Sequence, residues 1–353
     1  MSNSVRIAHI GVNYPHGIGY IESMLLIPDV QIVALYDPDP ASSVTMLPTP
    51  LQSLPVYDNL DTLLEEHNPE AVVVTQPNDI TPSIIAKAAS RGIHVFAEKP
   101  CARNAAEFMP AIEAIRTNGV QFSTGYTRRV SPAGMEIKNI VDQGILGRLV
   151  SIEASWITTS VQSRGATHPM FSSERNGGGI LHWLGCHWLD FMRWSTSAEV
   201  KEVASILGTT SKEPIDVEDT AALSMMFDNG MIGTLNCSYV IDRMPHQLLF
   251  GLRGTEGWLN WDYMSSKIHL RRAKADWASG LEQTLIFDTD NVGGYEMGDG
   301  VAILKRFISS FRENRPPAMS TADVLKVLEI IEAAHQSSDQ GQRVNTIKSS
   351  MPD

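Results

Sequence analysis

Short apolar segments alternate with helical patterns through the first 125 residues, and this alternation constrains the fold most strongly. The apolar segments are 5–12, 31–36, 71–75, 93–97 and 120–123, and the helical patterns are 18–26, 60–66, 82–90 and 105–117. Strands that are apolar throughout are buried on both faces, which requires helices on both sides of a parallel sheet. The sequence therefore predicts an α/β fold that begins with a doubly wound parallel sheet.

The rest of the chain has a different pattern, and 353 residues are more than one hydrophobic core usually serves. Strands are predicted at 220–227, 231–239, 247–252 and 257–261. Asp228-Asn229-Gly230 is typical of a turn between the first two of them. Helices are expected near 299–312 and 321–335, packed against the domains without a role in a site.

Charge and composition exclude several classes of partner. The net charge is −12, from 40 acidic and 28 basic residues, which disfavours binding to nucleic acid or to an anionic membrane surface. No apolar run approaches the roughly 18 to 20 residues that span a bilayer. The three cysteines are far apart and form no CxxC motif, so reduced thiols, no metal site and a cytoplasmic location are expected.

The turn after the first strand resembles a dinucleotide-binding loop in part. That loop has glycine at three positions, and here only Gly11 is in register, because Asn13 and His16 take the second and third places before Gly17. Asp37 ends the second strand, where a carboxylate can accept hydrogen bonds from the adenosine ribose and repel a 2′-phosphate. The 80 residues from Ile7 to Ala86 contain no Lys or Arg, which favours NAD over NADP.

Simpler interpretations of both features stay open. The loop could be a glycine-rich turn without a ligand, and Asp37 could belong to a solvated Asp-Pro turn.

Glu98-Lys99-Pro100 follows the strand at 93–97, at the carboxyl edge where open parallel sheets bind ligands. The proline disfavours helical backbone at Lys99. The Lys99 ammonium could hold a substrate hydroxyl or stabilise a developing alkoxide. The alternative is a Glu-Lys pair on the surface.

The segment 176–194 contains three consecutive glycines followed by a helical pattern. Trp183, His187, Asp190 and Trp194 recur at spacings of four, three and four residues, which places them on one helical face. His187 is a candidate acid or base, although a single histidine among apolar residues is often an ordinary core residue.

Taken together in this order, these motifs resemble those of the Gfo/Idh/MocA oxidoreductases, the group of glucose-fructose oxidoreductase and inositol dehydrogenase. The resemblance covers nearly the whole chain. The motifs that carry it are Asp37, Gln76-Pro77-Asn78, Glu98-Lys99-Pro100, Gly125-Tyr126 with Arg128-Arg129, and the GGG…GCHWLD segment at 177–190.

The resemblance implies an NAD-binding Rossmann domain at 1–126. It also implies a substrate-binding and oligomerisation domain at 127–353, whose open, largely antiparallel sheet forms one wall of the substrate cleft and whose C-terminal helices pack back. Lys99 and His187 are the implied catalytic residues. The implied cofactor-binding residues are Gly11, Asn13, His16, Gly17, Asp37, Gln76, Pro77, Asn78, Glu98 and Lys99, and the implied substrate-binding residues are Lys99, Tyr126, Arg128, Trp156, Trp183 and His187.

Two departures from the family pattern indicate an outlying branch. Trp183 stands where members commonly have Asp four residues before the histidine, and Thr81 stands where many have His. The neighbouring His182 points about a hundred degrees away from Trp183 on a regular helix and is a poor substitute for the missing carboxylate.

The implied activity is NAD-dependent oxidation of a secondary alcohol of a sugar, glycoside or cyclic polyol, by a homodimer or homotetramer. A redox-neutral glycosidase or lyase that passes through a transient keto-sugar would need the same Lys99 and His187. A non-catalytic binding homologue would explain the incomplete glycine loop and the missing Asp.

Overall fold

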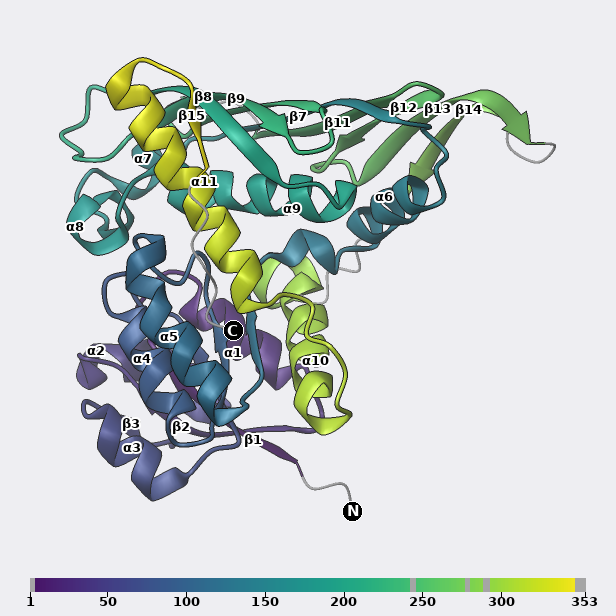
Figure 1. The fold of residues 1–353 in the computed structure, drawn as a ribbon. Coiled ribbons are helices and arrows are strands. Elements are labelled where there is room, and N and C mark those ends of the chain that lie inside the picture. Colours follow the sequence, from purple (N-terminus) through teal and green to yellow (C-terminus); the bar gives the residue numbers. More distant parts are fainter. Residues whose placement is uncertain (1–3, 242–245, 277–279, 288–292, 347–353) are drawn as a thin grey trace. The chain divides into compact units, whose positions relative to one another are not determined.

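The computed structural model describes residues 4–241, 246–276, 280–287 and 293–346 (Figure 1). These residues form two compact units, which are described separately. The first unit holds 4–130 and 293–325 of the described residues, and the second holds 131–287 and 326–346. The segment 293–325 therefore returns to the unit that contains the N-terminal residues.

The first unit is built on a parallel sheet of six strands. They are β1 (Val5–Ile10), β2 (Val30–Tyr36), β3 (Val56–Tyr57), β4 (Ala71–Val74), β5 (His94–Ala97) and β6 (Phe122–Thr124), in the order β3-β2-β1-β4-β5-β6. The direction in which strands are added reverses between β1 and β4, the position at which doubly wound sheets bind ligands. The predicted Rossmann fold is confirmed.

The helices of this unit are α1 (Gly17–Leu25), α2 (Pro40–Met46), α3 (Leu60–His67), α4 (Thr81–Ala89), α5 (Ala105–Asn118) and α10 (Asp299–Arg312). Four of these helices and the later helix α10 lie where they were predicted, whereas α2 was not predicted. Asn59 and Asn104 cap α3 and α5. Their side-chain oxygens accept hydrogen bonds from Thr62 N (3.1 Å) and Glu107 N (2.9 Å), backbone donors that have no partner within the helix. Gly119 ends α5 with a left-handed φ of 62°.

Gly17 lets α1 pack closely on the end of β1. A Cβ atom at this residue would lie 2.4 Å from Gly11 O and 2.5 Å from Val12 O, both backbone atoms that cannot easily move. The third glycine of a dinucleotide-binding loop has this packing role. In this chain the role falls to Gly17, one residue after the place that His16 occupies.

Replacing Gly17 by Ala should therefore destabilise the first unit. We expect Gly17→Ala to lower the free energy of unfolding by about 1–3 kcal/mol, the usual cost of overpacking a core. Gly19 in the same helix is the matched control, because its Cβ would make only ordinary contacts at 3.5 Å with Tyr295. Urea unfolding should show a lower midpoint for Gly17→Ala and an equal or higher one for Gly19→Ala, and equal loss in both variants would contradict the packing argument.

The second unit contains a sheet of nine strands in the order β14-β13-β12-β11-β7-β10-β9-β8-β15. The strands are β7 (Leu149–Ile157), β8 (Val200–Gly208), β9 (Thr220–Phe227), β10 (Ile232–Ser238), β11 (Gln247–Gly254), β12 (Gly257–Asp262), β13 (Lys267–Asp276), β14 (Gly280–Ile286) and β15 (Val344–Asn345). Every pairing is antiparallel except β7 with β10. The largely antiparallel sheet is confirmed.

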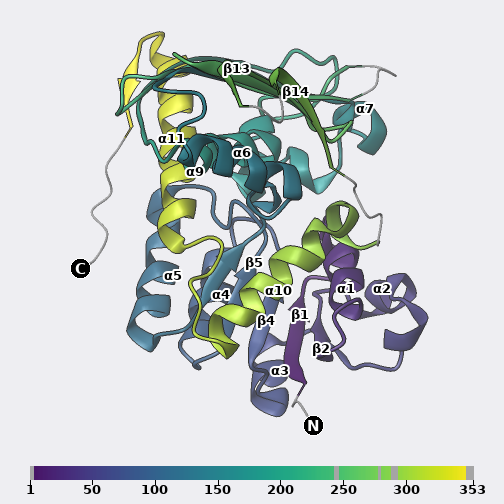
Figure 2. The same cartoon turned by 90° about the vertical axis from the view of Figure 1, so that its right-hand side faces the viewer.

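Helices α6 (Pro132–Asp142) and α9 (Cys186–Thr196) lie along one face of this sheet (Figures 1 and 2). Burial alternates along β10, where Gly233, Leu235 and Cys237 are buried and the residues between them are exposed. In the part of the chain that the structure describes, no helix covers the other face (Figure 2). The sheet is therefore open on one side.

The remaining helices of this unit include α7 (Ser160–Arg164), α8 (Ser173–Asn176) and the part of α11 (Thr321–Gln340) from Lys326 onward. Ser337 and Ser338 of α11 accept hydrogen bonds from Ser205 N and Leu207 N of β8, each 3.0 Å long. Among the described helices, none has the length and apolar content needed to cross a bilayer.

Candidate active site

The turn between β1 and α1 leads into a helix N-terminus that no side chain caps. Gly11 has a φ of 105°, and a Cβ there would lie 2.0 Å from Thr75 O. His16 takes a left-handed φ of 74° at the N-cap of α1, and its side chain makes no capping hydrogen bond. The first turn of α1 contains no acidic residue. A helix N-terminus in this state favours a negatively charged group.

Asp37 is buried at the end of β2 and is tied to the residue in the second glycine position. Its Oδ2 accepts from Asn13 N (2.8 Å), and its Oδ1 accepts from Asn13 Nδ2 (3.2 Å) and Asp39 N (3.0 Å). A carboxylate offers about four acceptor positions, so capacity for a further donor remains. No ion pair between described residues involves Asp37.

Gln76, Pro77 and Asn78 form the buried turn between β4 and α4. Thr81, at the start of α4, donates to Gln76 O and Pro77 O at 2.9 Å in each case. Thr81, which stands where many family members have His, therefore stabilises this turn through its side chain.

Glu98, Lys99 and His16 come together at the carboxyl end of β5. The Lys99 side chain is fully buried, with its Nζ 3.5 Å from Glu98 Oε1. His16 Nδ1 lies 3.1 Å from the same oxygen. The alternative of a Glu-Lys pair on the surface is wrong, because both side chains are buried. A buried ammonium beside one carboxylate is suited to binding a further polar group.

Burial and the neighbouring charges act in opposite directions on this cluster. Burial favours the neutral form of Glu98, but the charges of His16 and Lys99, with hydrogen bonds from His16 and Tyr20, outweigh it and lower the pKa of the carboxyl group. Burial and the Glu98 charge raise the pKa of Tyr20 well above its usual value. Glu98 is therefore ionised and Tyr20 neutral near pH 7.

Residues before and within α10 join this cluster, and none of them was predicted to do so. The Tyr295 ring lies 4.7 Å from the His16 ring and 4.6 Å from the Tyr20 ring, between centroids. Glu296 accepts a hydrogen bond from Thr127 Oγ1. Burial and the Glu296 charge raise the pKa of Asp299 to about 7, against the lowering effect of Arg128.

The expectation that helix 299–312 only packs against the domains therefore misses its first residue, Asp299, which lies near Glu296 and Arg128. One signal was available in the sequence: glycines at 293, 294, 298 and 300 surround an aromatic and two acidic residues, a composition typical of a ligand-facing loop. Tyr126 and Arg128, predicted substrate-binding residues, are both buried in the first unit, at 1% exposure each.

In the second unit, His187 lies in the first turn of α9 and is 2% exposed. Its ring lies 5.5 Å from the half-buried ring of Trp156 on β7, between centroids. The structure thus brings together two residues that are predicted to contact the substrate.

A π-helical turn, η4 (Leu181–Gly185), precedes α9 and carries Trp183. The sequence predicted one regular helix from about Gly179. The structure instead has a π turn at Leu181–Gly185 before the α-helix begins at Cys186. Such turns occur often at functional sites. Trp183 is 6% exposed, while His182 faces Glu218 and His335 in the same unit.

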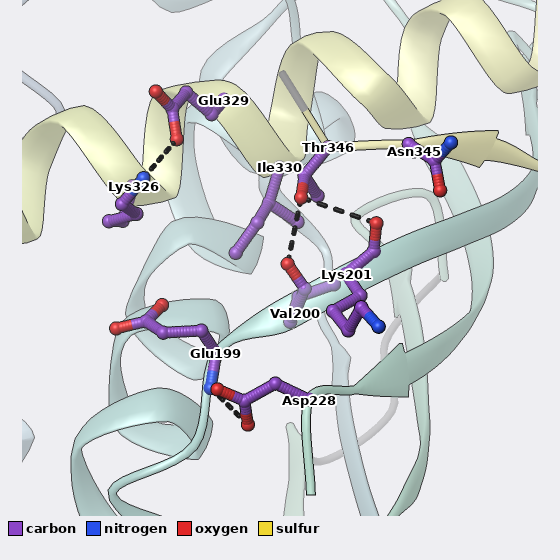
Figure 3. Close-up of a pocket in the computed structure, with 9 residues that line it drawn as sticks. All are labelled: Glu199, Val200, Lys201, Asp228, Lys326, Glu329, Ile330, Asn345 and Thr346. Atoms are coloured by element: carbon purple, nitrogen blue, oxygen red, sulfur yellow. Dashed lines mark hydrogen bonds and ion pairs between the residues drawn. The ribbon is translucent and has the colours of Figure 1, made fainter. Parts of the chain in front are cut away.

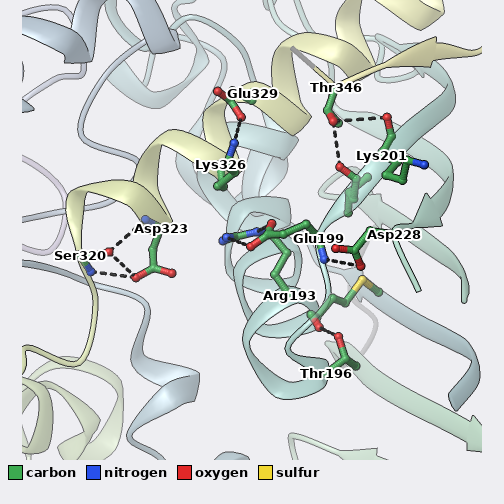
Figure 4. Close-up of polar contacts among 12 residues, drawn as sticks. Arg193, Thr196, Glu199, Lys201, Asp228, Ser320, Asp323, Lys326, Glu329 and Thr346 are labelled. Atoms are coloured by element: carbon green, nitrogen blue, oxygen red, sulfur yellow. Dashed lines mark hydrogen bonds and ion pairs between the residues drawn. The ribbon is translucent and has the colours of Figure 1, made fainter. Parts of the chain in front are cut away.

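A bidentate ion pair between Arg193 and Glu199 stabilises the C-terminal end of α9 (Figure 4). Arg193 Nε and Nη2 donate to the two carboxylate oxygens of Glu199 at 2.6 and 2.7 Å, and Glu199 N donates to Asp228 (3.1 Å). This contact fixes the helix that carries His187 at the end away from the histidine.

A cavity of about 660 Å³ lies beside β8, β15 and α11 (Figure 3). Lys326 pairs with Glu329 at 2.8 Å there, and Thr346 Oγ1 donates to Val200 O (2.8 Å). None of the predicted site residues lines this cavity.

The residues of the first unit fit NAD. The α1 N-terminus and the Gly11 turn suit a pyrophosphate, and Asp37 suits a ribose hydroxyl. A buried carboxylate without a basic neighbour does not suit the additional phosphate of NADP.

Two family models match this chain. Residues 5–126 match an oxidoreductase family with an NAD-binding Rossmann fold, and residues 135–260 match the GFO/IDH/MocA C-terminal domain. Together they cover most of both units.

Similar proteins agree with these matches. The chain is 23% identical to the rhizopine catabolism protein MocA of Rhizobium meliloti over 86% of each chain. It is 26% identical to myo-inositol 2-dehydrogenase of Thermotoga maritima over 82% of this chain and 83% of the relative. The fold superposes on levoglucosan dehydrogenase in complex with NADH and L-sorbose with a TM-score of 0.85 at 18% identity, covering 98% of this chain and 100% of that one. The chain belongs to the Gfo/Idh/MocA family of NAD-binding oxidoreductases.

Proposed function

We propose that this protein is an NAD-dependent dehydrogenase that oxidises a secondary alcohol of a sugar, glycoside or cyclic polyol. The observation that carries the proposal is the fully buried Lys99 ammonium beside Glu98, at the carboxyl end of the Rossmann sheet. Relatives named as inositol and levoglucosan dehydrogenases support the substrate class.

Lys99 is proposed to hold the reacting oxygen. Its Nζ donates to the substrate hydroxyl and stabilises the negative charge that grows on oxygen as the carbon–hydrogen bond breaks. Glu98 orients the ammonium, since the two groups are 3.5 Å apart in a buried setting.

His187 is proposed to accept the hydroxyl proton in oxidation and to return it in reduction. A neutral imidazole has a nitrogen lone pair that can accept this proton. When bound, NAD supplies the acceptor for the hydride. Trp156, Trp183, Tyr126 and Arg128 are proposed to contact the rest of the substrate, the tryptophans through the apolar face of a sugar ring.

NAD is proposed to contact the buried turns at the carboxyl edge of the parallel sheet. The residues assigned to it are Gly11, Asn13, His16, Gly17, Asp37, Gln76, Pro77, Asn78, Glu98 and Lys99. The N-terminus of α1 near Gly17 would face the pyrophosphate, and Asp37 would accept hydrogen bonds from the ribose.

Asp37→Ala should weaken NAD binding and reduce the preference for NAD over NADP. A hydrogen bond to a charged group contributes about 1.5–3 kcal/mol, so we expect the Kd for NAD to rise about 10- to 100-fold. Asp39→Ala is the control, because its side chain caps α2 through Ser42 N at 3.3 Å. Calorimetric titration of both variants with NAD and NADP measures the effect, and unchanged selectivity in Asp37→Ala would refute the ribose assignment.

A substrate screen tests the proposed activity. Purified protein is incubated with NAD and a panel of sugars, glycosides and inositols, while NADH absorbance and product release are followed together. The dehydrogenase produces NADH in step with a ketone. Product without net NADH would indicate the redox-neutral enzyme, and neither signal would indicate a non-catalytic homologue; both results would contradict the proposal.

Three further assignments belong to the proposal. Residues 1–126 act as the cofactor domain and 127–353 as the substrate and oligomerisation domain, whose C-terminal helices pack back, in line with the return of 293–325 to the first unit. The protein works in the cytoplasm. Subunits pair through the open face of the nine-stranded sheet, where Ile232 and Leu249 are 54% and 42% exposed. Exposed apolar side chains of this kind are typical of an interface.

A further inference from the structure

His182, Glu218 and His335 meet in the second unit from three separate elements. His182 lies in η4, Glu218 lies just before β9, and His335 lies in α11. One possible ligand atom from each residue lies within 4.8 Å of the other two. His335 Nε2 is 3.8 Å from Glu218 Oε1, and the two imidazole rings are 5.9 Å apart between centroids.

The carboxylate of this cluster is held in place by the backbone. Glu218 Oε2 accepts from Gly179 N (2.8 Å) and Oε1 accepts from Leu181 N (3.2 Å), both at the start of the helical segment that carries His182. Ile180 N also donates to Glu218 O (2.9 Å). These contacts leave lone pairs on the carboxylate available, since it has about four.

A glycine keeps space open between the two histidines. A Cβ atom at Gly178 would lie 2.5 Å from His182 Nδ1 and 3.1 Å from His335 Nε2. Both nitrogens therefore border the same small space. His335 Nε2 is buried and makes no hydrogen bond to any residue that the structure describes.

The space adjoins a cavity of about 340 Å³ with acidic walls. Gly178, Glu218 and His335 line it, together with Asp216 and Asp339, and no Lys or Arg is among its lining residues. The local charge favours a cation. The cavity also gives water or another small ligand access to the cluster.

We propose that His182, Glu218 and His335 bind a divalent transition metal ion, and that this ion is Zn²⁺. Two imidazole nitrogens and one carboxylate are a donor set that Zn²⁺ accepts, with a fourth position left for water. Zinc–ligand distances are about 2.0–2.2 Å, so the His335 side chain closes in by a small rotation when the ion binds. The ion would link η4, the segment just before β9 and α11, which are distant from one another in the sequence.

Equilibrium dialysis of the full-length, tag-free protein against Zn²⁺, with metal analysis of the protein, tests the site. We expect one ion per chain in the wild type. His335→Gln should weaken binding by about 100-fold or more, since loss of even an outer-shell partner costs 10- to 100-fold. His269→Gln is the matched control in the same unit, because His269 is exposed and pairs with Thr284 (3.0 Å).

Gly178→Ala keeps all three ligands but fills the space between them, so it should also weaken Zn²⁺ binding. This variant tests the geometry even if a histidine variant folds poorly. Co²⁺ in place of Zn²⁺ should give the weak visible bands of a nitrogen and oxygen site without thiolate charge transfer, which separates the site from the three cysteines. Absence of binding in the wild type, or equal binding in wild type and His335→Gln, would overturn the proposal.

Discussion

Lys99→Met is expected to lower kcat by about 10²–10³-fold, the usual cost of removing one preorganised donor at a developing oxyanion. Methionine has nearly the same length and apolar stem, so the buried space around Nζ stays filled. The loss should appear in kcat and in kcat/KM alike, because the ammonium acts mainly as charge grows in the transition state. Steady-state kinetics on the best substrate of the panel measures it.

Lys87→Met is the control for this variant. Lys87 lies on α4 in the same unit and forms a partly exposed ion pair with Asp61 at 2.6 Å. Lys87→Met should leave kcat unchanged. NAD binding should survive in both variants, weakened at most by the loss of the Lys99 contact in Lys99→Met, which shows that the Rossmann unit is folded. Near-normal turnover in Lys99→Met would remove this lysine from the mechanism.

His187→Asn is expected to lower kcat by about 10²–10⁴-fold, the range for loss of a general acid or base. The wild type should also lose oxidation activity on the acid side of its pH profile, once the ring is protonated, because the protonated ring cannot accept the hydroxyl proton. The variant should lack this acid limb. A merely structural histidine would leave the shape of the pH profile unchanged.

His269→Asn is the control here, since this histidine lies on β13 in the same unit and hydrogen-bonds to Thr284. It should retain both the rate and the acid limb. If His187→Asn keeps the acid limb of the wild type, another group is the base. Asp299, whose pKa is raised by burial to about 7, is then the next residue to replace.

The Rossmann part of the fold could be predicted from the sequence because its signals are local. Strands such as β4 at Ala71–Val74 are apolar at every position, and Asn104 and Gly119 mark the ends of α5. Periodicity and capping residues therefore located the strands and helices of this unit except α2 and β3. The packing role of Gly17 could not be read in this way, since it depends on two backbone oxygens that only the folded turn brings close.

The second unit was harder to predict. β9 was predicted at its observed bounds. β7 and β8 were not predicted, because their burial patterns are irregular and five of the nine residues in each strand are partly exposed. The π turn before α9 also escaped prediction, since its hydrogen-bonding pattern leaves no mark in residue spacing.

The candidate site was predictable where a motif lies next to a strand end, as for Asp37 and Lys99. It was not predictable where distant segments meet. Tyr295 packs against His16 across almost 280 residues of sequence, and His335 meets Glu218 from a separate helix. Contacts of this kind follow from the fold and from no local pattern.

Hydride transfer from the substrate carbon is the central claim, and isotope tracing tests it most directly. A sugar or polyol that carries deuterium on its carbinol carbon is incubated with the protein and NAD, and the nucleotide and the product are analysed by mass spectrometry. The account predicts that deuterium appears in NADH in step with loss from the product. Deuterium that stays in the product, or NADH without deuterium, would contradict it.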